Sequence, residues 1–129
     1  MVYYLRIVKA SAKSTQRAAA CREEESLDAV FGALSDRTRR RLLARLAHGP
    51  ATVTELAAPF DMSLPAVSKH IKVLERSGLV RRTIDGRVHH CELDPEPLRR
   101  ASDYVEQYRQ FWDETLAALA RYAEEEEPR

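Results

Sequence analysis

The stretch TVTELAAPFDMSLPAVSKHIKVLERSGLV, residues 52–80, decides the fold because it predicts two helices joined by a short turn. Thr52 and Glu55 have the T-x-x-E spacing of a capping box, in which each side chain satisfies a free N–H at a helix start. Asp61 lies where the chain must turn tightly, a geometry that aspartate tolerates. Ser63 follows as the N-cap of the second helix. The spacing therefore predicts a helix-turn-helix.

The second of these helices has an apolar face opposite a polar, cationic face. Val67, Ile71 and Leu74 recur at helical spacing and predict the buried side. The opposite side has small polar and cationic groups: Ser68, Lys69, Lys72, Arg76. A helix that reads the major groove of DNA needs such groups near its start. We therefore predict that this helix binds DNA.

Two more helices are expected before this unit. Leu27, Val30 and Phe31 recur at helical spacing after Ser26, a residue suited to an N-cap, and predict a short first helix. The second helix has an inner face of leucines and ends at a Gly-Pro stop signal at residues 49–50. The core of the domain is predicted to contain Leu42, Leu46, Leu56, Val67, Ile71 and Leu74.

A basic β-hairpin is expected after the helix-turn-helix. Residues 79–84 and 87–93 are β-prone and flank Asp85 and Gly86, a strong two-residue hairpin signal. Its arginines are Arg81, Arg82 and Arg87. Such a hairpin can follow the phosphate backbone or reach into a minor groove. The order of four helices, a hairpin and a last helix predicts a mainly α winged helix-turn-helix fold with a small β-hairpin.

The last predicted helix follows the proline-containing break at residues 94–97 and has a continuous apolar seam. Its members are separated alternately by three and four residues for about three heptads: Leu98, Ala101, Val105, Tyr108, Trp112, Thr115, Leu119, Tyr122. One helix cannot bury such a seam, and a partner subunit is the simplest cover. Packing within its own domain and a pocket for an apolar effector are the alternatives.

Charge is distributed unevenly along the 129 residues, although the formal net charge is only +1. Residues 36–90 have eleven basic and five acidic groups, which gives +6, and residues 91–129 have five basic and eleven acidic groups, which gives −6. A basic middle segment predicts a polyanionic partner. The two cysteines are too few for a disulfide framework, and no apolar run is long enough for a bilayer, so we expect an intracellular protein without a membrane partner.

Residues 52–95, together with FGALSDRTRRRLLARLAHG at residues 31–49, resemble the ArsR/SmtB family of bacterial winged-helix transcriptional repressors. The pattern SLPAVSKHIKVLERSGLV at residues 63–80 is the most specific part. The family's Asp-Pro-Thr-Arg motif reads DRTR here, at residues 36–39, without the proline. The resemblance leaves residues 1–26 unmatched. It implies a cytoplasmic bacterial homodimer formed through the first and last helices, with the fourth helix in the major groove.

The sequence departs from the metal-sensing members of that family at both of their metal sites. Where they have cysteines in an ELCVCDL-like motif, residues 55–61 read ELAAPFD, and the last helix has Asp103 and Glu114 but no histidine. Soft metals need clustered thiolates, so the chain resembles the non-metal branch, and we expect neither metal nor cofactor. The run HHC at residues 89–91 cannot hold one ion because strand residues alternate in direction. One of its histidines should be packed and the other exposed.

Two surfaces are therefore predicted. The DNA-contacting residues are Ser63, Leu64, Pro65, Ser68, Lys69, His70, Lys72, Arg82 and Arg87. The dimer-interface residues are Leu27, Val30, Phe31, Ala101, Val105, Tyr108, Trp112 and Leu119. A bond from His70 to a neighbouring side chain is the alternative to DNA contact, and Arg37 and Arg39 fit phosphate contact and a solvated face equally.

We interpret residues 1–26 as a flexible leader or the product of an upstream start, 27–93 as the DNA-binding domain, 94–123 as the dimerisation helix and 124–129 as an acidic tail. The predicted function is a sequence-specific transcriptional regulator, a homodimeric repressor on a palindromic operator. No grouping of residues predicts catalysis. The alternatives are a metal- or thiol-gated sensor and a winged helix that contacts only protein. A small-molecule effector is left open, and Cys21 and Cys91 are expected to be inert thiols.

Overall fold

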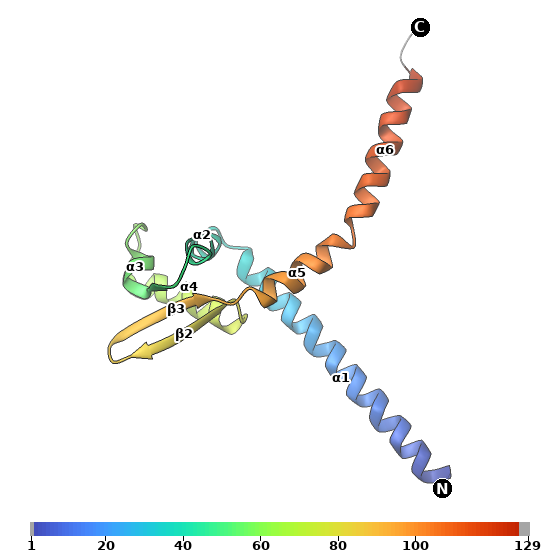
Figure 1. The fold of residues 1–129 in the computed structure, drawn as a ribbon, viewed down its shortest axis with the longest axis horizontal. Coiled ribbons are helices and arrows are strands. Elements are labelled where there is room, and N and C mark those ends of the chain that lie inside the picture. The colour runs from blue at the N-terminus through green and yellow to red at the C-terminus, as the bar shows by residue number, and fades with distance from the viewer. Residues whose placement is uncertain (1, 127–129) are drawn as a thin grey trace.

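The computed structural model describes the backbone of residues 2–126 and the side chains of residues 15–126. It is mostly helical with a small antiparallel sheet, which confirms the predicted winged helix-turn-helix fold (Figure 1). The elements are α1 (Val2–Leu34), α2 (Arg37–Leu46), β1 (Ala51–Thr52), α3 (Val53–Ala57), α4 (Leu64–Arg76), β2 (Val80–Asp85), β3 (Val88–Leu93), α5 (Glu96–Glu106) and α6 (Arg109–Glu126). Helices α1 and α6 extend away from the body that the other elements form (Figure 1).

Side-chain caps begin three of these helices. The hydroxyl of Thr52 accepts from the backbone N–H of Glu55 at 3.2 Å, as the capping-box spacing predicts. Ser63 accepts in the same way from Ala66 at 3.3 Å, with Pro65 in the first turn of α4. Asp36 caps α2. The Thr52 and Ser63 bonds fix where the two helices of the helix-turn-helix begin.

The core lies where α2, α3 and α4 meet α1 and the sheet. All six residues predicted for it are buried: Leu42, Leu46, Leu56, Val67, Ile71, Leu74. The other buried members of this cluster are Val30, Ala33, Leu43, Ala51, Leu79, Val80, Cys91 and Ala101. Burial of one aliphatic side chain of this size stabilises a fold by about 1.5–3 kcal/mol. Helix α4 is therefore held by its inner face, which leaves its outer face free.

The sheet has three strands, in the order β1-β3-β2, one more than the sequence predicted. Strand β1 pairs antiparallel with β3 through Ala51↔Cys91 and Thr52↔His90. Two residues are too short a run to show the period-two pattern of a strand. In the hairpin, Asp85 pairs with Val88, and Gly86 has a φ of +62°, which glycine adopts without steric cost. The predicted hairpin is confirmed, but its two turn residues are Gly86 and Arg87, one position later than the predicted Asp85 and Gly86.

The first helix is longer than expected. We expected it to begin at Ser26, but α1 runs without interruption from Val2 to Leu34. The physical reason is that residues 2–31 contain neither Gly nor Pro and are rich in Ala, Lys, Arg, Gln and Glu, which favour a helix. Ser26 therefore lies within a helix, where its side chain does not act as an N-cap.

The last helix is divided, which corrects the prediction of one continuous seam. Helix α5 ends at Glu106 and α6 begins at Arg109, and the intervening Tyr108 N–H donates to Val105 O at 3.0 Å, a tight i→i−3 turn. No Gly or Pro marks this position in the sequence. Helix α5 packs against α1, whereas α6 has no buried residue within residues 109–126. The two helices therefore need not share an axis.

Candidate nucleic-acid interface

Helix α4 presents the predicted DNA-contacting side chains on its outer face. Ser63 lies at its N-cap, and Leu64, Pro65, Lys69 and Lys72 are exposed, whereas Ser68 is half-buried. The exposed fraction of Leu64 is 50%, so an apolar side chain stands free beside the N-terminal turn. Such a group can contact a thymine methyl while the cations bind phosphate.

Five cations on α4 and the hairpin are exposed: Lys69, Lys72, Arg76, Arg81, Arg87. None of their side chains forms an ion pair or a hydrogen bond with any residue that the structure describes. Other arginines behave differently, since Arg99 pairs with Glu96 at 2.6 Å and Arg109 pairs with Glu106 at 3.1 Å. The positive charge of this face is therefore not neutralised within the described protomer, and it is available to a polyanion.

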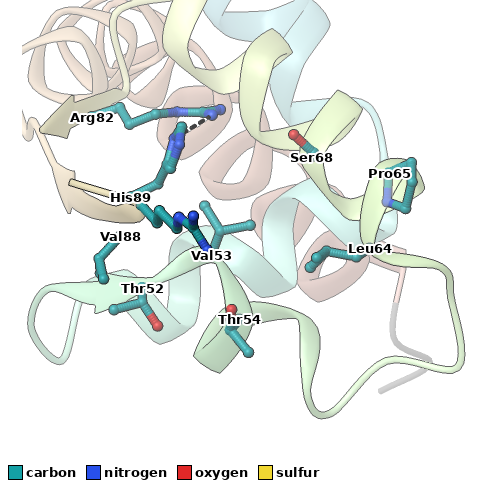
Figure 2. Close-up of a pocket in the computed structure, with 10 residues that line it drawn as sticks. Thr52, Val53, Thr54, Leu64, Pro65, Ser68, Arg82, Val88 and His89 are labelled. Atoms are coloured by element: carbon teal, nitrogen blue, oxygen red, sulfur yellow. Dashed lines mark hydrogen bonds between the residues drawn. The ribbon is translucent and has the colours of Figure 1, made fainter. Parts of the chain in front are cut away.

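A groove separates the start of α4 from the hairpin (Figure 2). Its volume is about 600 Å³, and its walls are largely apolar. Thr52, Val53 and Thr54 form one side, Leu64, Pro65 and Ser68 form another, and the hairpin contributes Arg82, Arg87, Val88 and His89. In Figure 2, a hydrogen bond joins Arg82 and His89 on the hairpin side of the groove, away from Leu64 and Pro65. The groove thus places predicted base-reading and phosphate-binding residues along one concave surface.

Arg82 does not lie on the exposed face. Only 12% of its side chain is exposed, and its Nε lies 2.7 Å from Glu75 Oε1, an ion-pair distance without the alignment of a hydrogen bond. Its Nη1 also donates to Nδ1 of His89 at 3.3 Å. In an antiparallel strand, Arg81 and Arg82 must point to opposite faces, and Arg82 points to α4. This placement does not support the predicted contact between Arg82 and DNA.

His70 also points inward, which favours the alternative of a bond to a neighbour. Its Nδ1 accepts from Arg39 Nη1 at 3.3 Å and lies 3.7 Å from Asp36 Oδ2. Arg39 also donates to the carbonyls of Ala33, at 2.7 Å, and Gly32, at 3.2 Å. Arg39 is therefore engaged at the end of α1, which favours a structural role over phosphate contact, whereas Arg37 is exposed.

Asp36 is held in its charged form at this junction. The backbone N–H of Arg39 donates to its Oδ2 at 3.0 Å, and this bond holds the pKa of the carboxyl below its usual value. Because Asp36 is also the N-cap of α2, its negative charge faces the positive end of the helix dipole. At the junction of α1, α2 and α4, the side chains of Asp36, Arg39 and His70 thus form a polar cluster that contacts itself.

A second, apolar surface lies on α5 and α6. Val105, Tyr108, Trp112 and Leu119 are exposed, and so are their neighbours on the stripe: Tyr104, Phe111, Leu116, Tyr122. Phe31 of α1 continues it, because its ring contacts Tyr104 at 5.9 Å and Tyr104 contacts Tyr108 at 5.6 Å, both edge to face. We missed Tyr104 in the sequence, although it stands four residues before Tyr108, a spacing that places both on one face of the single helix predicted there.

Some of the residues predicted for the dimer interface are not exposed. Val30 and Ala101 are buried in the protomer's own core, and Leu27 is half-buried against it. The physical reason is that α1 and α5 pack on each other within one chain, which uses part of the apolar spacing that we attributed to a partner. The predicted dimer interface is therefore limited to Phe31 and the exposed residues of α5 and α6.

The thiols and histidines of the described chain show no sign of a reactive or metal-binding site. Burial raises the pKa of the Cys91 thiol, and the neighbouring Glu25 raises that of Cys21, so both changes disfavour the thiolate. His89 is half-buried and His90 exposed, as strand alternation predicts. Among the residues described, no three His, Cys, Asp or Glu side chains gather as metal ligands would.

No helix among the described residues is long and apolar enough to cross a membrane.

Known proteins with related sequences and folds include transcriptional regulators. A helix-turn-helix domain family matches residues 34–83. An HTH-type transcriptional regulator of Mycobacterium tuberculosis is 39% identical over 101 residues, which cover 78% of this chain and 92% of that protein. The arsenical resistance operon repressor of Escherichia coli is 28% identical over 93 residues, 71% of this chain and 80% of the repressor.

Solved structures show the same relationship. The crystal structure of an ArsR family transcriptional regulator matches with a TM-score of 0.66 and 46% identity, covering 70% of this chain and 93% of that one. An ArsR-like transcriptional regulator from Rhodococcus sp. RHA1 matches with a TM-score of 0.60 and 31% identity, covering 78% of this chain and 94% of that one.

Proposed function

Because this chain belongs to the ArsR family of DNA-binding, winged helix-turn-helix transcriptional regulators, we propose that it acts as a homodimeric repressor of a palindromic operator. In this proposal, α4 enters the major groove and the β2–β3 hairpin, the wing, binds the phosphate backbone. Lys69 and Lys72 bind phosphate, and Ser68 with Leu64 faces the base edges.

The observation that carries the proposal is the cationic face of α4 and the wing. Its five cations are exposed and have no acidic partner among the residues described. A face used only for contact with a protein would gain little from unpaired charge that must be desolvated. A duplex, which has one negative charge per about 1.7 Å of its axis, offers the complementary partner.

The dimer is proposed from the apolar stripe of α5 and α6. Trp112 and Leu119 are large and apolar, yet their exposed fractions are 60% and 59%. A contiguous exposed stripe of this kind marks an interaction surface. A second copy of the same stripe is its simplest partner, because a twofold dimer places two recognition helices on successive major grooves.

Replacing Arg87 with Ala is expected to weaken binding to all duplexes alike and to reduce its salt dependence. Each phosphate contact that is lost makes the slope of log affinity against log salt concentration shallower by about 0.9. Fluorescence anisotropy with a labelled duplex at several salt concentrations measures the slope. Arg121→Ala, which removes an exposed arginine of α6, is the matched control. A slope unchanged by Arg87→Ala would place this residue away from DNA.

Replacing Ser68 with Ala is expected to change which duplexes are preferred and to leave the salt slope alone. The reason is that Ser68 is assigned to the bases, and one mismatched contact changes affinity by about 1–3 kcal/mol at that position. Competition among duplexes that differ by single base pairs ranks the preferences of both proteins. Ser102→Ala on α5 serves as the control. If the ranking survives Ser68→Ala, the residue does not read bases.

A further inference from the structure

We propose that Glu75 and Arg82 are positioning residues that, with His89, set the angle of the wing against the recognition helix. They bind no DNA themselves and act through Arg87, which they place on the phosphate backbone. This inference rests on the proposed function, since it requires that α4 and the wing bind one duplex together.

The three side chains form a continuous link between three elements. Glu75 belongs to the last turns of α4, Arg82 to β2 and His89 to β3. Arg82 lies 2.7 Å from Glu75 on one side and 3.3 Å from His89 on the other. Because an arginine can only donate, Nδ1 of His89 accepts this bond.

The atoms that meet in this link are shielded from solvent. Oε1 of Glu75 and both Nε and Nη2 of Arg82 have almost no accessible surface. Exposed ion pairs are worth little because water competes for both charges. Although 36% of the Glu75 side chain is exposed, water is excluded at the atoms in contact, so this ion pair restrains the distance between the two elements more than a surface pair would.

The link is also the outermost anchor of the wing. Near its base, Val80 and Cys91 are buried in the core. Beyond them, Thr83, Ile84, Asp85 and Val88 are all exposed, so Arg82 and His89 hold the rest of the hairpin against the domain. Arg87 lies at the tip, past this anchor. Its position on DNA therefore depends on the Glu75–Arg82 contact.

The contact has a second consequence for the DNA-facing surface. Glu75 is the only acidic residue of α4, on the same helix as the cations Lys69, Lys72 and Arg76. Pairing with Arg82 neutralises its charge and turns it toward the wing. An unpaired carboxylate on a helix that binds DNA would repel phosphate. Because Glu75 is paired with Arg82, it adds little of this repulsion.

Glu75→Gln tests the proposal by a double-mutant cycle with Arg87→Ala. The probe is a labelled duplex that the wild-type protein has selected from a random-sequence library. In the wild-type background, we expect Arg87→Ala to weaken binding by about tenfold or more. In the Glu75→Gln background, the same change should cost less than about twofold, because a misplaced wing no longer brings Arg87 to phosphate. Glu92→Gln, on an exposed position of β3, is the matched control and should leave the Arg87 penalty intact.

The opposite assignment makes the opposite prediction. If Arg82 bound DNA directly, Glu75→Gln would release it and remove an acid, so affinity would rise and the Arg87 penalty would persist. Either result overturns the proposal. Should Glu75→Gln fail to fold, the doubly neutral variant Glu75→Gln/Arg82→Gln removes the charge pair without leaving a buried charge, and it must show the same loss of the Arg87 penalty. The exchanged pair Glu75→Arg/Arg82→Glu should restore the penalty.

A measurement without DNA separates this proposal from the proposed function. Hydrogen exchange of the hairpin amides at residues 82–91 should accelerate at least about tenfold in Glu75→Gln, while amides of α2 and of the first half of α4 remain unchanged. Unchanged exchange in the hairpin would contradict the positioning role even if the protein binds DNA. Failure of the wild-type protein to bind any duplex, with faster exchange in the variant, would instead contradict the proposed function and the placement of Arg87 on phosphate, while the role of the link in holding the wing would stand.

Discussion

Replacing Trp112 with Ala should leave the folded protomer intact and dissociate the dimer. Trp112 is 60% exposed and touches Phe111, its neighbour on α6, at a ring distance of 5.9 Å, so its truncation removes little packing from the protomer. In the proposed dimer it stands within the apolar stripe of both subunits. Interface tryptophans of this kind cost at least about 2 kcal/mol each when truncated, or about 4 kcal/mol for the pair. The dissociation constant should therefore rise about a thousandfold.

Sedimentation across a dilution series measures this change, with circular dichroism to confirm that helical content persists. Trp112 is the single tryptophan of the chain, so a blue shift of wild-type emission with rising concentration reports its burial independently. Arg121→Ala changes another exposed side chain of α6 outside the apolar stripe and should remain dimeric. A Trp112→Ala protein that stays dimeric would show that the stripe of α6 does not form the interface. One that unfolds would assign Trp112 to the protomer core.

Charge reversal at Lys69 and Lys72 should abolish specific DNA binding. Both side chains are exposed and make no ion pair among the described residues, so Glu at either position is compatible with the fold. In a dimer, four cations become four anions on the face proposed to meet phosphate. Loss of four phosphate contacts alone weakens binding by about a thousandfold at physiological salt, and repulsion adds to this. Unfolding temperature and dimerisation should be unchanged.

The control for this variant has the same net charge. Arg22→Glu/Arg121→Glu reverses two exposed arginines on α1 and α6, away from α4 and the wing. It should retain nearly all affinity, apart from a general loss that added salt screens. Equal losses in the two variants would mean that overall charge, and not the face of α4 and the wing, determines binding.

The helix-turn-helix could be predicted from sequence because local signals agree with each other there. The caps Thr52 and Ser63, the apolar spacing of α4 and the Asp-Gly signal of the hairpin each act within a few residues. The six predicted core residues are buried for the same reason. In this region the spacing, the caps and the tertiary contacts all favour the same structure.

The predictions that were wrong concern features without a capping, spacing or turn signal. The length of α1, the strand β1 and the break between α5 and α6 depend on helix propensity alone or on contacts with distant elements. Spacing also cannot tell whether an apolar residue is buried by its own chain or by a partner, which is why Val30 and Ala101 were assigned to an interface.

The sequence also did not show in which direction the cationic side chains point. Arg81, Arg82 and Arg87 are alike in sequence, yet strand direction turns Arg82 to Glu75 and leaves the other two exposed. In the same way, His70 accepts a hydrogen bond from Arg39, because α2 lies beside α4 in the fold. A contact between residues far apart in the chain decides both cases, and no pattern within α4 or β2 encodes it.

Selection of duplexes from a random-sequence library by the purified wild-type protein tests the central claim most directly. A homodimer with α4 in the major groove must enrich an inverted repeat whose half-site centres lie about 10–10.5 base pairs, or a multiple of that, apart. We expect this repeat, and we expect the Trp112→Ala protein to enrich none under the same conditions. Enrichment of a single unrepeated half-site at full affinity, or of no sequence at all by the wild-type protein, would contradict the account.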